Sequence, residues 1–277
     1  MSELALAALF AVFIWWFSTG IVLLLDRLPH GALRWGHWLS SLLALTAFVA
    51  LTHTARELTV ANAYCAFTSA LLVWGWHELS FLSGWVTGPR KTALPSGTTG
   101  WPRFVESVRA ILWHELAILA VGVAIVVVTW GQPNQVGTMT FGVLWVMRTS
   151  AKLNLFFGVR NLSEEFLPAH LAYLQSFFRR RSMNALLPFS VLGASVVLVT
   201  MVLGATDPAA TQAQVVGTAL VGTMLALAIV EHLLLVLPIP STALWRWALR
   251  GGEVPATAAR PVPNAPLDTH DDLLRAR

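Results

Sequence analysis

Seven apolar runs, most of them about 20 residues long, recur along the chain and limit what it can fold into. A helix of about 20 apolar residues spans the hydrocarbon core of a bilayer and satisfies its own backbone hydrogen bonds there. The runs are Leu4–Leu25, Trp38–Leu51, Leu58–Ser83, Val108–Trp130, Val136–Gly158, Ala185–Gly204 and Val215–Leu237. This pattern predicts an all-α integral membrane protein, a bundle of about seven transmembrane helices.

The low content of charged residues favours a membrane protein over a soluble one. Only 12% of the 277 residues are charged, whereas soluble globular proteins carry about 25%. Thirteen Trp stand against two Tyr, and Trp is enriched at membrane interfaces. The first run lacks the basic start and small-residue cleavage site of a signal peptide, so we expect a retained span. Cys65 is the single cysteine; it excludes a disulfide within one chain, and we expect a small buried thiol.

Three segments are expected to lie outside the spans. Residues 84–102 are rich in Gly, Pro and Thr, which predicts an exposed loop. Residues 163–181 carry apolar side chains at three- and four-residue spacing and end in three arginines. They predict an amphipathic helix in the membrane interface between spans five and six. The aperiodic tail predicts disorder, so the expected division is a transmembrane domain over 1–250 and a disordered cytoplasmic tail over 251–277.

Lys and Arg residues concentrate in alternate connections between the runs. One side holds Arg27, Arg34, Arg90, Lys91, Arg103, Arg109, Arg160, Arg179 to Arg181 and the arginines after residue 245; the other side holds only Arg56. Connections rich in Lys and Arg stay in the cytoplasm. The bias therefore predicts an N-terminus outside the cytoplasm and a C-terminus inside. It also explains the net charge of +4 without a nucleic-acid partner.

Ionisable residues inside four of the runs are the candidate functional residues. A charged group at the bilayer centre costs about 2.5–3.5 kcal/mol on insertion scales, so such residues suggest a function. At a rise of ~1.5 Å per residue, all of them fall roughly 9–15 Å inside the cytoplasmic boundary and share one layer. They are His77, Glu78, His114, Glu115, Arg148, Lys152, Glu231 and His232.

Four interpretations of this polar layer stay open. The three carboxylates can simply neutralise Arg148 and Lys152, since buried charges require partners. The six His and Glu residues can bind a divalent metal, although adjacent His-Glu pairs point about 100° apart on a helix. The imidazoles of His77, His114 and His232 can serve as axial ligands of a tetrapyrrole metal, beside neighbouring Trp rings. Proton or solute transport is the fourth interpretation, but no inverted repeat supports it.

Four segments carry a more specific pattern: WHELSFLSGWVTGPR (76–90), LWHELA (112–117), RTSAKLNLF with GVRN (148–156 and 158–161) and FLPAHLAYL (166–174). In these segments the chain resembles the PuhE family, the photosynthetic complex assembly proteins of purple and aerobic anoxygenic phototrophic bacteria. The resemblance covers about residues 1–240 and leaves the tail outside.

The resemblance implies a membrane assembly factor for the photosynthetic reaction centre and core antenna, acting through bacteriochlorophyll handling or supply. It implies reaction-centre or antenna subunits, tetrapyrrole pigment and the lipid bilayer as partners. It also implies a bacterial inner or intracytoplasmic membrane, in which the charge bias places the N-terminus in the periplasm and the C-terminus in the cytoplasm, and it supplies no catalytic residues. The alternative is a membrane metalloenzyme whose His and Glu residues hold a metal and act on a lipophilic or tetrapyrrole substrate. Of the two, the enzyme is less favoured.

Overall fold

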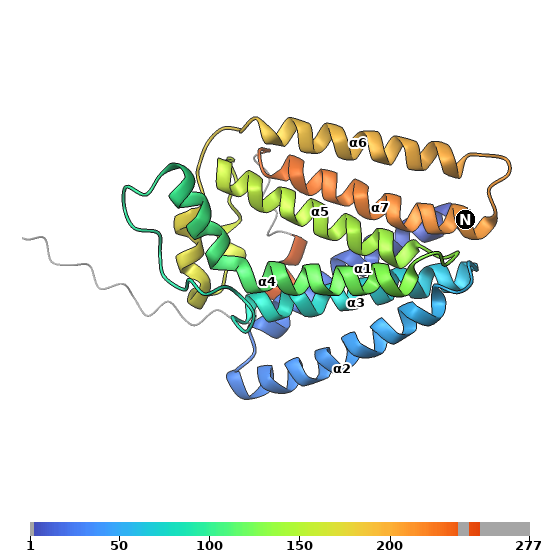
Figure 1. Cartoon of the computed structure of the whole chain (residues 1–277), viewed down its shortest axis with the longest axis horizontal. Helices are drawn as coiled ribbons and strands as arrows, with labels where there is room; N and C mark the ends of the chain where they lie inside the picture. Colours follow the sequence, from blue (N-terminus) through green and yellow to red (C-terminus); the bar gives the residue numbers. More distant parts are fainter. Residues whose placement is uncertain (1–2, 238–243, 250–277) are drawn as a thin grey trace, which may run out of the picture.

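The computed structural model describes residues 3–237 and 244–249, so the tail predicted for 251–277 lies outside the described residues. Seven long helices are present there, one for each apolar run. They are α1 (Glu3–Asp26), α2 (His30–Thr54), α3 (Val60–Leu82), α4 (Gly100–Thr129), α5 (Val136–Phe157), α6 (Leu186–Ala205) and α7 (Gln212–Leu234). Successive helices run in opposite directions, and their connections alternate between the two ends of the bundle (Figure 1).

Five of these helices, α1, α2, α4, α6 and α7, are long and apolar enough to cross a membrane. The prediction of an all-α membrane bundle is therefore confirmed. The helices α3 and α5 are less apolar because they carry several of the ionisable residues, such as Glu78 and Lys152. The helix α3 packs against α1, α2, α4, α5 and α7. The side chains of α3 therefore contact protein over most of their surface. They need not be as apolar as side chains that contact lipid.

The charge bias follows the two ends of the bundle. The connections after α1, α3 and α5 carry most of the basic residues that lie outside helices, and we call their side the basic end. The connections after α2, α4 and α6 form the opposite end, where Arg56 is the sole Lys or Arg.

Two helices begin earlier than the apolar runs because polar side chains in their first turns have partners. The helix α2 starts at His30 rather than Trp38; His37 is fully buried there, with Nε2 2.8 Å from the Ser83 hydroxyl. The helix α4 starts at Gly100 rather than Val108, and Glu106 in its second turn pairs with Arg90 at 2.7 Å. Hydropathy alone could not include these turns, since His37 and Glu106 are held by tertiary contacts.

Residues 163–181 do not form the single continuous amphipathic helix that was expected. The segment forms two 3₁₀-helices, η1 (Glu164–Phe166) and η2 (Ala169–Phe177). Leu171, Leu174 and Phe177 recur at every third residue, which matches the three residues per turn of a 3₁₀-helix. These three side chains are buried against the ends of α1, α3 and α4. The apolar side of η2 therefore packs on protein rather than on lipid.

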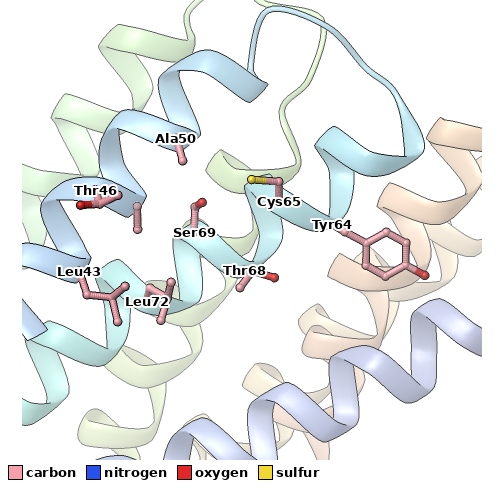
Figure 2. Close-up of a pocket in the computed structure, with 9 residues that line it drawn as sticks. Leu43, Thr46, Ala50, Tyr64, Cys65, Thr68, Ser69 and Leu72 are labelled. Atoms are coloured by element: carbon pink, nitrogen blue, oxygen red, sulfur yellow. The ribbon is translucent and has the colours of Figure 1, made fainter.

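A shallow groove of about 430 Å³ runs between α2 and α3 towards the opposite end of the bundle (Figure 2). Its lining is mostly apolar, and Cys65 and Ser69 of α3 face Ala50 and Thr46 of α2 across it. Cys65 is exposed there rather than buried as expected. Residues of the polar layer do not line the groove.

Candidate functional site

Two ion pairs connect α5 to its neighbours in the polar layer. Arg148 and Lys152 lie one turn apart on α5, so they point to the same side of that helix. The Arg148 guanidinium is 3.1 Å from a carboxylate oxygen of Glu78 on α3. Lys152 Nζ is 2.6 Å from a carboxylate oxygen of Glu115 on α4. Each cation thus has its own carboxylate, and the two pairs join three helices.

Glu231 is the third carboxylate of the layer and lies on the surface of the bundle. Its Oε1 accepts a hydrogen bond of 3.1 Å from the indole Nε1 of Trp15, which links α7 to α1. Arg148 attracts it electrostatically but forms its direct contact with Glu78. The layer therefore holds three carboxylates and two cations. Among the side chains that the structure describes, Glu231 is hydrogen-bonded to the neutral indole of Trp15 instead of forming an ion pair.

His232, next to Glu231 in sequence, is buried among hydrogen-bond partners. Its Nδ1 is 2.9 Å from the carbonyl oxygen of Ala228, one turn earlier on α7. Its Nε2 is 2.9 Å from the hydroxyl of Ser150 on α5. Both ring nitrogens are thus engaged, and the ring fastens α7 to α5.

His77 and His114 form a buried imidazole pair at the interface of α3 and α4. Each is only 1% exposed, and their ring centroids lie 6.5 Å apart. Phe81 packs on His114 at 4.6 Å, and Trp76 lies 5.0 Å from His77. Within the described part of the chain, neither nitrogen of His114 has a hydrogen-bond partner, and Nε2 of His77 has none. A buried polar atom without a partner costs about 1–3 kcal/mol, so the imidazole pair is unlike the well-bonded His232.

The connection after α3 holds the backbone of His114 in place. The backbone N–H of His114 donates to the carbonyl oxygen of Thr87 at 2.9 Å, and that of Arg90 donates to the carbonyl oxygen of Arg109 at 3.3 Å. A Cβ atom at Gly88 would overlap the carbonyl oxygens of Arg109 and Ala110. Figure 1 shows that α4 bends, with its first turns at an angle to the rest.

This contact corrects part of the expectation that residues 84–102 form an exposed loop: most of the segment is exposed, but Thr87 and Gly88 are buried. Thr87 is 3% exposed, and its hydroxyl is among the buried groups without a partner, as is the hydroxyl of Ser80. Sequence reasoning missed both residues because neither is ionisable. Gly88 was the available signal, since glycine is the residue that lets two backbones approach closely.

The eight predicted residues therefore share a layer but form separate contacts. His77 and His114 come together, and Glu78 and Glu115 pair with Arg148 and Lys152, respectively. On α7, Glu231 contacts α1 and His232 contacts α5. Among the described residues, no group of three or more His, Cys, Asp or Glu side chains is arranged to hold a metal ion. Adjacent residues on a helix point about 100° apart, which explains why the His and the Glu of each pair contact different neighbours.

The helices and their polar layer define an integral membrane helical bundle that carries a layer of ionisable side chains. The chain belongs to the DUF3623 family, described as a protein family of unknown function, whose model matches residues 1–256. It is 39% identical over 267 residues to a protein of Rhodobacter capsulatus described as an uncharacterized 30.4 kDa protein in the puhA 5′ region. The alignment covers 93% of this chain and 96% of the relative. No solved structure matches the chain.

Proposed function

We propose that this protein is a non-enzymatic membrane assembly factor for the photosynthetic reaction centre and its core antenna, and that it handles bacteriochlorophyll. The position of the relative's gene in the puhA 5′ region, within a photosynthesis gene cluster, supports the first part. The resemblance of residues 76–90 and 112–117 to the PuhE family supports it as well. Both histidines of the imidazole pair lie within these two segments.

The observation that carries the pigment-handling part is the state of His114. An imidazole nitrogen with a free lone pair is a natural axial ligand for the central metal of a tetrapyrrole, and His114 has two ring nitrogens without a partner. Phe81 and Trp76 give the imidazole pair an aromatic surrounding suited to contact with a macrocycle. We assign His114 as the first candidate ligand and His77 as the second. His232 is the weakest of the three because both its nitrogens are bonded.

The orientation and the number of spans are part of the same proposal. The helices α3 and α5 cross the membrane with the other five, since they lie within the same antiparallel bundle (Figure 1). The basic end then faces the cytoplasm and the N-terminus faces the periplasm. The imidazole pair lies in the cytoplasmic half of the membrane under this assignment.

Replacement of His114 by Ala in a phototrophic host tests the function. We expect a reduced yield of reaction centre and core antenna in membrane absorption spectra, with the variant protein still present in the membrane by immunoblot. His53→Ala is the matched control, because His53 is an exposed histidine at the opposite end of the bundle. Normal complex levels in the His114→Ala strain would contradict the proposal.

The purified protein separates pigment handling from the metalloenzyme alternative. Pigment handling predicts a co-purifying or added bacteriochlorophyll whose red absorption band shifts on binding, and loss of that shift in His114→Ala. Stoichiometric iron, zinc or manganese by elemental analysis, lost in the same variant and without a pigment band, would favour the metalloenzyme instead. The imidazole nitrogens of His77 and His114 without hydrogen-bond partners are the observation that favours this second function.

A further inference from the structure

Arg103, in the first turn of α4, is a buried cation at the basic end of the bundle. It is 4% exposed, and its guanidinium donates to the carbonyl oxygens of Phe156 at 2.9 Å and Phe177 at 2.5 Å. It also lies over the ring of Phe156 at 3.9 Å from the centroid. Among the described side chains, no carboxylate forms an ion pair with Arg103, although a buried charge is stable only with compensation.

Two further arginines lie beside it at fixed backbone positions. The N–H of Arg179 donates to the carbonyl oxygen of Leu155, and that of Arg181 donates to the carbonyl oxygen of Val159, both at 3.1 Å. The side chain of Arg181 crosses Gly158, whose φ of 117° and missing Cβ leave room for it. Both arginines repel Arg103 electrostatically. We call Arg103, Arg179 and Arg181 the arginine cluster.

The charges near the arginine cluster do not balance it. The Arg103 guanidinium and the backbone N–H of Arg179 contact carbonyl groups in the last turn of α5, where the helix dipole supplies only about half a negative charge. The nearby carboxylates have other partners: Glu164 forms an ion pair with Arg180 at 3.4 Å, and Glu106 forms ion pairs with Arg90 and Arg109. Within the described residues, three cations therefore meet a fraction of one negative charge, and the site has capacity for an anion.

The surface next to the arginine cluster indicates which anion fits. Phe157, which precedes Gly158 in the chain, and Met183, two residues after Arg181, are 43% and 52% exposed. Trp101, in the same first turn as Arg103, is 72% exposed, and exposed Trp residues mark the level of the lipid headgroups. The cluster thus lies at a helix end beside exposed apolar side chains, where a phospholipid places its phosphate beside its acyl chains.

We propose that the arginine cluster binds the phosphate of an anionic phospholipid, with the acyl chains of that lipid against Phe157 and Met183. The site is distinct from the imidazole pair and does not depend on complex assembly or pigment handling, but it rests on the proposed membrane placement of the basic end. Arg103 supplies a positive field at the base of the site, and Arg179 and Arg181 contact the headgroup.

Native mass spectrometry of the detergent-solubilised full chain tests this proposal with phosphatidylglycerol and phosphatidylcholine as probes. We expect the wild type to retain phosphatidylglycerol in preference to phosphatidylcholine. The Arg179→Gln, Arg181→Gln double variant should lose about thirtyfold in phosphatidylglycerol affinity, because each arginine near an anionic lipid contributes a factor of about five. Glutamine keeps the Cγ and Cδ atoms that pack on Gly158, and the backbone contacts do not change.

The matched control is the Arg34→Gln, Lys91→Gln double variant. It removes the same net charge from exposed positions at the same end of the bundle, and it should keep the wild-type preference. An equal loss of phosphatidylglycerol affinity in both double variants would show that net charge alone causes the effect, and it would overturn the site. Displacement of the lipid by inorganic phosphate or by an acidic peptide at comparable concentration would overturn the assignment to a phospholipid.

Discussion

The backbone N–H of His114 donates to the carbonyl oxygen of Thr87 at 2.9 Å, so a connection between two helices sets the position of a buried imidazole. This contact brings together two of the segments that resemble the PuhE family, 76–90 and 112–117. A third, 166–174, packs against the same ends of α3 and α4 through Leu171 and Leu174. Three of the four segments therefore form one structural unit around the imidazole pair, and the fourth, over residues 148–161, lies on α5 and directly after it.

Gly88→Ala should destabilise the bundle because the added methyl group would overlap the backbone carbonyls of Arg109 and Ala110. Overpacking of this kind typically costs about 1–3 kcal/mol. Thermal unfolding of the protein in detergent should show a lower midpoint. Gly142→Ala is the control, since no atom lies within 4 Å of the added Cβ there. Equal midpoints for the two variants would contradict the close approach at Gly88.

His114→Phe should leave the thermal midpoint unchanged or raise it, because it removes two buried nitrogens without partners. The same variant should lose the proposed activity, measured as the yield of photosynthetic complexes. His232→Phe should instead lower the midpoint, since it leaves the Ser150 hydroxyl and the Ala228 carbonyl without their imidazole partner. A larger stability loss for His114→Phe than for His232→Phe would show that the His114 nitrogens are bonded.

Glu115→Gln and Lys152→Met should each destabilise the protein, by up to about 3 kcal/mol, because each leaves a poorly exposed charge without its partner. The double variant should lose less than the sum of the single variants, since it removes both charges. Unfolding of the four proteins in detergent gives the coupling free energy directly. Additive losses would mean that the pair at 2.6 Å contributes no coupling.

Accessibility of single cysteines tests the orientation in a Cys65→Ser background. A cysteine at Ala209, between α6 and α7, should react with a membrane-impermeant maleimide added to spheroplasts. A cysteine at Ser96, between α3 and α4, should react only after the membrane is permeabilised. Both positions are exposed in the structure. The reverse pattern would invert the proposed topology.

The sequence predicted the helices and the level of the ionisable residues, because both depend on distance along the chain. Glu78 and Lys152 reached the same layer for that reason. Which side chains meet depends on the rotation of each helix about its axis, and that rotation is set by packing over the whole bundle. The bonding of His232 to Ser150, and the free state of His114, could therefore not be predicted from spacing.

The segments outside the helices were harder to predict. A Gly- and Pro-rich composition is typical of exposed loops, yet residues 86–90 pack against α4 because Gly88 has no side chain. The apolar spacing over 163–181 fitted an amphipathic helix as well as a 3₁₀-helix. The available apolar surface at the ends of α1, α3 and α4 decided between them, and a single sequence does not reveal that surface.

The hydrogen bond from Trp15 to Glu231 has a consequence for biosynthesis. It joins the first long helix to the last, and chains are synthesised and inserted from the N-terminus. The indole of Trp15 therefore has no such acceptor until α7, which follows five further long helices in the chain, has been synthesised. Only a chain translated past α7 acquires the contact, so this side of the molecule distinguishes a finished protein from a truncated one.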